Sequence, residues 1–249
     1  MSPPSALWKR CLAGVVILAA MLALVSLGVW QLQRKTWKES LISDINSRAH
    51  AVVTELPSEN SWPSWNAAAD EFRHVTVSGT YLHDWETPVY GLMQTAQLGA
   101  GQNATGSVQG SYIFTPLLLD NGAIIFINRG FVPDGQMDAV SHPGEHVQVS
   151  GILRAPEKRG WFVPENNPEK GKWYTRASNA MAAYYQFERP APFYLEADAQ
   201  PKASEAVSWP QGGVTRTITL KNDHLQYALT WFGLALTLFG VSAWSVFRK

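Results

Sequence analysis

Cysteine is almost absent from this sequence of 249 residues, because Cys11 is the only one. A lone cysteine excludes an intrachain disulfide, so packing and hydrogen bonds must hold the fold together. Charge is also sparse: charged residues make up 16% of the chain, and 20 basic residues balance 20 acidic ones. Without net charge or a long basic run, the chain lacks the electrostatic character of a nucleic-acid-binding protein. No nucleic-acid partner is therefore expected.

Sequence signatures of common catalytic sites are missing as well. The chain contains no GxSxG elbow, no GxxxxGK[ST] loop, no HExxH motif and no CxxC pair. His142 and His146 are four residues apart, but a Pro-Gly pair between them prevents a shared helical face. Asp84 and Glu86 lie near an expected turn, where carboxylates are usually solvated. The remaining histidines of the central segment have no partners nearby in the sequence: His50, His74 and His83. We therefore expect a protein that is not an enzyme.

Two long apolar segments carry no charge at all. They cover residues 11–33 and 225–247, and each has 23 residues. At a rise of about 1.5 Å per residue, each would form a helix of about 34 Å, enough to cross a bilayer. Aromatic residues of the kind enriched at membrane interfaces lie near their ends: Trp8, Trp30, Tyr227 and Trp244. The first segment is longer than the apolar region of a cleaved signal peptide, so we interpret it as a retained anchor.

These segments predict a membrane protein with a two-helix transmembrane hairpin and one folded domain. We divide the chain into a short cytoplasmic tail (1–10), a first transmembrane helix (11–33), an extracytoplasmic β-rich domain (34–223), a second transmembrane helix (224–247) and a second cytoplasmic tail (248–249). Basic residues flank both ends of both helices, so they do not decide the orientation. We place the domain outside the cytoplasm because long loops translocate largely regardless of their charge.

The tails and the N-terminal composition narrow the expected class and location. The short tails leave no room for a signalling output domain, and no Arg-rich, Ser-rich transit peptide is visible. We therefore expect a multi-pass protein of a bacterial cytoplasmic (inner) membrane, with its central domain on the periplasmic or outer side.

The central segment mostly shows strand patterns, which predict a largely antiparallel β (α+β) domain. The first helix should continue into solution to about residue 50, because apolar residues recur there at every fourth position. In "FRHVTVSGTY", Val75, Val77 and Tyr81 alternate onto one face. Two β-rich runs flank the sequence Asp-Asn-Gly at 120–122, which predicts a hairpin with a tight turn.

The second half of the domain gives weaker signals. In "EHVQVSGILR", the alternation of Val147, Val149 and Ile152 slips at Gly151, which predicts a β-bulge. Other expected elements are a loop at 91–110, a helix at 178–187 capped by Ser178 or Asn179, and short strands at 193–197 and 214–220. The stretch Asn128, Arg129 and Gly130 is expected to end a strand and start a turn.

The entrance to the second apolar helix is the strongest candidate site. On a helix, His224, Ala228, Trp231 and Ala235 fall on one face. The imidazole would lie at the membrane interface, above one small side chain and one large flat side chain. This arrangement predicts a shallow apolar space below a potential axial ligand.

Cations from the first helix would complete a haem site. In an antiparallel hairpin the end of the first helix lies alongside, which brings Arg34 and Lys35 level with His224. A haem requires an imidazole for iron, apolar walls for the macrocycle and cations for the propionates. A simpler interpretation stays open: Asn222 or Asp223 caps the helix, His224 is an interfacial anchor, and Arg34 pairs with Asp223. Small residues expected to serve helix packing are Ala19 with Ala23 and Gly233 with Thr237.

Several stretches of the chain resemble the Surfeit locus protein 1 family of terminal-oxidase assembly factors. In chain order these are LGVWQLQRKTWKESLI, FRHVTVSGTYLHDWE, YIFTPLLLDNGAIIFINRGFVP, FVPENNPEKGKWYTR and GGVTRTITLKNDHLQYALTWFGLA. The resemblance implies a non-catalytic factor that helps to build a haem-copper oxidase when subunit I receives its haem. The partners it implies are subunit I, other oxidase subunits or assembly factors, and the lipid bilayer.

The resemblance also bears on the candidate site. In some bacterial family members a histidine matching His224 is implicated in haem binding, which makes His224 a candidate ligand of the iron of haem A or haem O. The candidate cofactor-binding residues are His224, Trp231, Tyr227, Arg34 and Lys35. Two alternatives stay open: a scaffold for oxidase subunits that binds no haem, and an enzyme acting on an extracytoplasmic lipid or peptide. The enzyme would require a cluster of buried ionisable groups, which the sequence does not reveal.

Overall fold

The chain divides into two compact units in the computed structural model. The model describes residues 4–98, 105–144, 146–199, 209–212 and 222–248. One unit comprises residues 1–44 and 219–249, and the other comprises residues 45–218. The first unit is helical, and the second contains all the strands.

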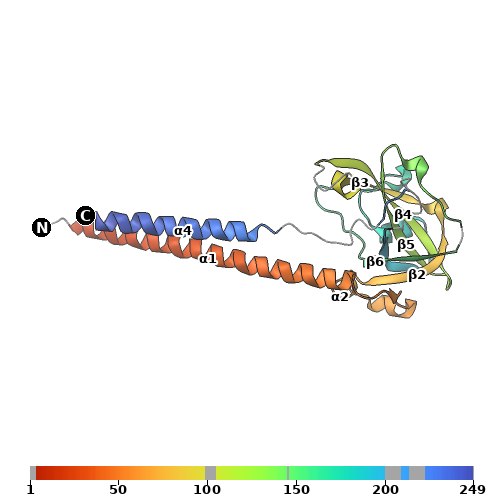
Figure 1. Ribbon diagram of the computed structural model, residues 1–249, viewed down its shortest axis with the longest axis horizontal. Helices are drawn as coiled ribbons and strands as arrows, with labels where there is room; N and C mark the ends of the chain where they lie inside the picture. Colours follow the sequence, from red (N-terminus) through yellow and green to blue (C-terminus); the bar gives the residue numbers. More distant parts are fainter. Residues whose placement is uncertain (1–3, 99–104, 145, 200–208, 213–221, 249) are drawn as a thin grey trace. The chain divides into compact units, whose positions relative to one another are not determined.

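Two long helices form the helical unit. Helix α1 (Pro4–Ala49) and helix α4 (His224–Phe247) run antiparallel, so that the start of α1 and the end of α4 lie at the same end of the pair (Figure 1). Both are long and apolar enough to cross a membrane, with mean hydropathies of 2.7 and 1.4 over their most apolar windows. The expected extension of the first helix to about residue 50 is confirmed by α1. The orientation in a membrane stays a prediction.

The two helices approach each other closely at a glycine of α1. Gly28 is buried, and a Cβ atom placed on it would lie 2.6 Å from the ring of Phe232. On α4, Ala228 and Ala235 are buried, as expected for the face that also carries His224. The packing role predicted for the four small residues was wrong, because all of them are exposed: Ala19, Ala23, Gly233 and Thr237. A glycine opposite a phenylalanine makes the contact instead.

The other unit is a closed β-barrel with additional short elements (Figure 1). Its strands are β1 (Thr54–Glu55), β2 (His74–Tyr81), β3 (Thr87–Gln94), β4 (Ser107–Leu119), β5 (Ile124–Pro133), β6 (His146–Arg154) and β7 (Pro190–Ala197). The sheet order is β1-β2-β6-β7-β5-β4-β3, and an extra pairing of β2 with β4 closes the barrel. Only β1–β2 and β5–β7 pair in parallel among the described strands. The largely antiparallel domain is confirmed, whereas closure into a barrel was not predicted.

The central hairpin forms as the sequence predicted. Strands β4 and β5 pair in antiparallel register from Gly110 to Leu118 on the first strand. In the turn, the side chain of Asn121 accepts a hydrogen bond from the backbone of Ala123, and Gly122 has a φ of +82°. A left-handed φ of this kind favours glycine, which explains the Asp-Asn-Gly signal.

Strand β6 corrects the predicted bulge at Gly151. Pairing with β2 runs in unbroken register past this residue, and the barrel core includes Val149 and Leu153, whereas Ile152 is buried but lies outside that cluster. A Cβ atom on Gly151 would lie 2.2 Å from the backbone oxygen of Glu196 on β7. The glycine therefore allows β6 and β7 to approach each other closely, and β6 contains no extra residue at this position.

Three further expectations were wrong. Much of the predicted loop at 91–110 is strand, because β3 extends to Gln94 and β4 begins at Ser107. Helix α3 (Ser178–Tyr184) has Ala177 as its N-cap, without a side-chain capping bond. The stretch 128–130 lies within β5 rather than at its end. The strand predicted at 214–220 lies outside the described residues.

Short elements surround the barrel and complete the domain. They are α2 (Ala67–Asp70) and the 3-10 turns η1 (Glu59–Ser64), η2 (His83–Trp85), η3 (Thr95–Leu98), η4 (Met137–Ala139) and η5 (Pro168–Lys170). The main core lies inside the barrel and includes Val75, Leu117, Ile125, Leu153 and Phe193.

Candidate functional site

His224 is the first residue of α4, and its imidazole contacts α1. The side chain is half-buried, and Nδ1 lies 2.7 Å from the amide oxygen of Gln31. Because an amide oxygen only accepts hydrogen bonds, Nδ1 carries the proton in the neutral ring. Nε2 then retains its lone pair, and it has no hydrogen-bond partner among the described residues. The contact fixes both the tautomer and the orientation of the ring.

The two predicted cations are engaged along α1 instead of at His224. The guanidinium of Arg34 lies 3.9 Å from the centre of the Trp37 ring, and Nζ of Lys35 lies 2.7 Å from a carboxylate oxygen of Glu39. The polar residue that contacts His224 is Gln31, which the sequence reasoning missed. Gln31 precedes Lys35 by four residues and lies on the same face of α1. This helical spacing was the signal in the sequence that could have identified Gln31 as a partner of His224.

The apolar space predicted beneath His224 is closed. Ala228 has no exposed surface, because α4 packs against α1 at this level. Trp231 is half-buried, and Tyr227 is exposed. A shallow hollow of about 550 Å³ does lie at the start of α4, but His224 is not among its lining residues, which are Asn222, Asp223, Leu225, Gln226, Leu229 and Thr230. The described helical pair therefore presents a ligand atom without a formed pocket for a macrocycle.

Asp223 occupies the N-cap position of α4, as the simpler interpretation expected. Its side chain makes no capping hydrogen bond to the helix. The Oδ1 atom of Asn222 is buried and has no hydrogen-bond partner among the residues that the structure describes. The helix therefore begins at His224 without a side-chain cap.

A second polar cluster, which the sequence reasoning missed, lies on the barrel. The carboxylate of Glu86 accepts hydrogen bonds at Oε2 from Arg129 and from the hydroxyl of Thr115, both at 2.9 Å. Arg129 also donates to the backbone oxygen of Ser141. Its guanidinium lies 5.1 Å from the centre of the Tyr81 ring. Burial raises the pKa of the Tyr81 hydroxyl to about 12, although the nearby Arg129 opposes this shift.

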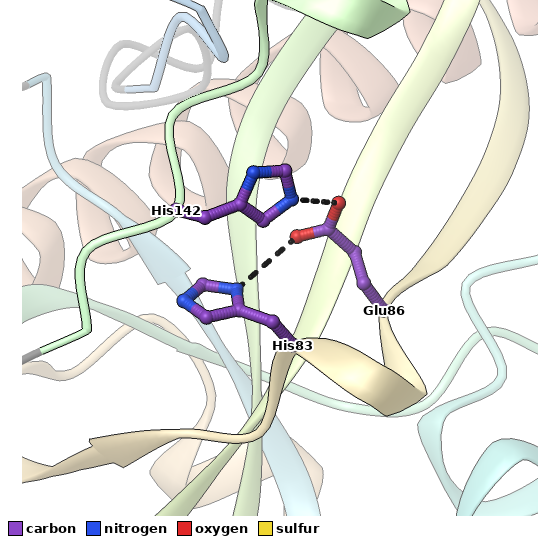
Figure 2. A group of neighbouring side chains, drawn as sticks. All are labelled: His83, Glu86 and His142. Atoms are coloured by element: carbon purple, nitrogen blue, oxygen red, sulfur yellow. Dashed lines mark hydrogen bonds and ion pairs between the residues drawn. The ribbon is translucent and has the colours of Figure 1, made fainter.

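Two histidines complete this cluster (Figure 2). Nε2 of His142 lies 3.3 Å from Oε1 of Glu86, and Nδ1 of His83 lies 3.7 Å from Oε2. Sequence reasoning found no partners near His83, and the structure supplies one in Glu86. The expectation of a solvated Glu86 was wrong, because its carboxylate is largely buried and accepts hydrogen bonds from Arg129 and Thr115. Short sequence spacing could not show the cluster, because 56 residues separate Glu86 from His142.

The chain is similar to known proteins over most of its length. The model of the SURF1 family matches residues 18–236. The chain is 36% identical to Surfeit locus protein 1 of Homo sapiens over 232 residues, which cover 88% of this chain and 73% of the relative. It is 35% identical to a SURF1-like protein of Caenorhabditis elegans over 242 residues, covering 92% and 72% of the two chains. A SURF1-like protein of Monosiga brevicollis is 33% identical over 244 residues, covering 94% and 86%. The chain belongs to the SURF1 family.

Proposed function

We propose that this protein is a membrane-anchored, non-catalytic assembly factor for a haem-copper terminal oxidase. Membership of the SURF1 family supports an assembly role, and two apolar helices of membrane-spanning length support a membrane location. The client is subunit I, together with other oxidase subunits or assembly factors. We place the protein in a bacterial cytoplasmic membrane with the barrel on the outer side, as the sequence predicted.

We further propose that His224 offers Nε2 to the iron of haem A or haem O. The observation that carries this proposal is the hydrogen bond from Nδ1 to Gln31 at 2.7 Å. Histidines that ligate metals almost always donate their other ring N–H to an acceptor, which fixes the tautomer and raises the basicity of the ligating nitrogen. Bound haem would be the group to be delivered to subunit I, and the part of this chain is to hold and orient it.

Because the packing at Ala228 is closed, the apolar walls of such a site must be supplied by groups outside the interface between α1 and α4. Ala228 leaves no room between α1 and α4, so a macrocycle on Nε2 would rest against exposed side chains such as Tyr227 and against lipid or the client. A site that is completed by the client suits transfer, because the haem is then already in contact with its acceptor. Arg34 would have to leave Trp37, or Lys35 would have to leave Glu39, to reach a propionate.

The test is haem retention by the purified full chain from cells that make haem A or haem O. We expect His224→Ala to lose the haem absorption bands and Gln31→Leu to weaken haem binding by about 10- to 100-fold, as is typical when a partner of a ligating group is removed. His146→Ala is the matched control, because His146 lies on the barrel and pairs with Asp120. An unchanged spectrum in His224→Ala would remove the axial-ligand assignment.

A scaffold without haem is the second candidate. The closed space at Ala228 and the engagement of Arg34 with Trp37 and of Lys35 with Glu39 favour it. In that case the protein would hold partially built subunit I while haem arrives by another route. Co-purification with oxidase subunits but never with haem, unaffected by His224→Ala, would support the scaffold.

A further inference from the structure

His83, Glu86 and His142 gather at one place on the barrel from two separate segments. His83 lies in η2 and Glu86 directly follows it, whereas His142 lies in the connection between β5 and β6. One nitrogen or oxygen from each residue lies within 4.8 Å of the others (Figure 2). Two imidazoles and a carboxylate form a ligand set typical of zinc sites that keep an open position.

The protonation of His83 leaves a lone pair directed into the cluster. Its Nε2 lies 2.9 Å from the backbone oxygen of Pro143. A carbonyl oxygen only accepts, so Nε2 carries the proton and Nδ1 of the neutral ring does not. Nδ1 is buried and has no hydrogen-bond partner within the part of the chain that the structure describes, although it faces Oε2 of Glu86 at 3.7 Å. Burying a lone pair opposite a carboxylate oxygen is unfavourable, and a metal ion bound to both residues would satisfy it.

The carboxylate of Glu86 is held by groups that leave one oxygen accessible. Arg129 and Thr115 both donate to Oε2, and both side chains are largely buried. Oε1 lies 3.3 Å from Nε2 of His142. Partners of this kind orient a ligating group in known metal sites. Arg129 also offsets the charge of Glu86.

The separations fit a small divalent ion. Zinc bonds of about 2.0–2.2 Å place neighbouring ligand atoms of a tetrahedron about 3.3–3.6 Å apart. Nε2 of His142 lies at this spacing from Oε1 of Glu86, at 3.3 Å, and Nδ1 of His83 lies slightly farther, 3.7 Å, from the other carboxylate oxygen, Oε2. The two imidazole rings are 4.8 Å apart and nearly perpendicular. The His142 side chain is half-exposed, so its ring can move toward His83 without disturbing the core.

We infer that His83, Glu86 and His142 bind a divalent transition-metal ion, with zinc as the reference ion. His83 contributes Nδ1, His142 contributes Nε2 and Glu86 contributes a carboxylate oxygen. Arg129 and Thr115 hold the carboxylate, and Pro143 fixes the tautomer of His83. Three protein ligands leave a fourth position for water or for a donor group of a partner. The site is separate from the haem proposed at His224 and requires only residues of the barrel.

The measurement is zinc binding by the full-length chain in detergent, after removal of metals with a chelator. Isothermal titration with zinc chloride should give one ion per chain. We expect His142→Ala to weaken this binding at least tenfold, and Thr115→Val to weaken it by about tenfold, the lower end of the effect of removing such supporting partners. His146→Ala removes a histidine that is exposed and lies outside the cluster, so it should leave the affinity unchanged.

Two further readouts separate this site from other metal binding. X-ray absorption at the zinc edge should show two imidazoles in the wild-type chain and fewer in His142→Ala. Zinc should raise the melting temperature of the wild-type chain and not that of His142→Ala, because only a ligand of the folded state stabilises it. The melting temperature of His142→Ala without metal checks that this variant folds.

The results distinguish this inference from the haem proposal. Equal zinc affinity in the wild type, His142→Ala and His146→Ala would show adventitious binding only and would overturn the assignment. So would the absence of stoichiometric binding in the wild type. Loss of zinc binding in His224→Ala, with retention in His142→Ala, would place the metal on α4 instead. The haem result stands apart, because His142→Ala leaves His224 and Gln31 intact.

Discussion

Closure of the barrel depends on the absence of a side chain at Gly79. Strand β2 pairs with β6 along its length and also reaches β4, where Gly79 lies opposite Leu119. A Cβ atom at position 79 would lie 2.3 Å from the backbone oxygen of Leu118. Ordinary contact begins at 3.4 Å, so in Gly79→Ala the two backbones would have to separate by about 1 Å. A backbone oxygen cannot rotate away as a flexible side chain can.

The cost of this separation can be worked from the contacts it disturbs. Overpacking of a core typically costs about 1–3 kcal/mol, and each net hydrogen bond that lengthens costs about 1 kcal/mol more. We therefore expect Gly79→Ala to lower the free energy of unfolding by about 3 kcal/mol. For a domain of this size that corresponds to a fall in melting temperature of about 6–12 °C.

Gly144→Ala is the control variant, because it should raise the free energy of unfolding rather than lower it. A Cβ atom at Gly144 meets no atom within 4 Å. Where the native backbone suits alanine, replacing glycine stabilises a protein by about 0.4–1 kcal/mol through the unfolded chain. Thermal unfolding of the full chain in detergent, followed by near-ultraviolet circular dichroism, measures both variants. If Gly79→Ala melted within about 2 °C of the wild type, the argument for closure at this glycine would fail.

Three other predictions concern separate parts of the molecule. Gly28→Leu should accelerate backbone hydrogen exchange in α4, because the new side chain collides with Phe232, whereas Gly14→Leu should not, since a Cβ atom there meets nothing within 4 Å. Phe193→Ala should lower the free energy of unfolding by about 3–5 kcal/mol in a denaturant titration, because it empties a fully buried site in the barrel core. Burial raises the pKa of Tyr81 to about 12, so the stability it contributes is complete below pH 10 and is lost as the pH rises toward 12. Tyr81→Phe should therefore remove a late component from an ultraviolet titration of the tyrosines and weaken the loss of stability at high pH.

Local patterns predicted much of the secondary structure for a direct reason. The Asp-Asn-Gly turn, the extension of the first helix and the faces of β2 all follow from the period and the backbone preference of a few consecutive residues. The misplaced bulge at Gly151 shows the limit of such reasoning. The glycine interrupts the apolar pattern because the neighbouring strand β7 approaches β6 closely at this position, and not because β6 contains an extra residue.

The candidate site on α4 was predictable in part. The helical period correctly placed His224, Ala228 and Ala235 on one face. The period of one helix does not show which residue of another helix lies opposite. The sequence therefore could not show that Gln31, rather than Arg34 or Lys35, contacts the imidazole. The haem interpretation remains a proposal.

Sequence by itself determined the two apolar helices, the antiparallel hairpin and the family of the chain, because each depends on neighbouring residues or on motifs in order. Tertiary structure alone decided that β2 meets β4 and that His83, Glu86 and His142 come together. Those contacts join positions tens of residues apart, and no local period records them. They exist only because the strands close into a barrel, which brings η2 and the connection before β6 to the same place.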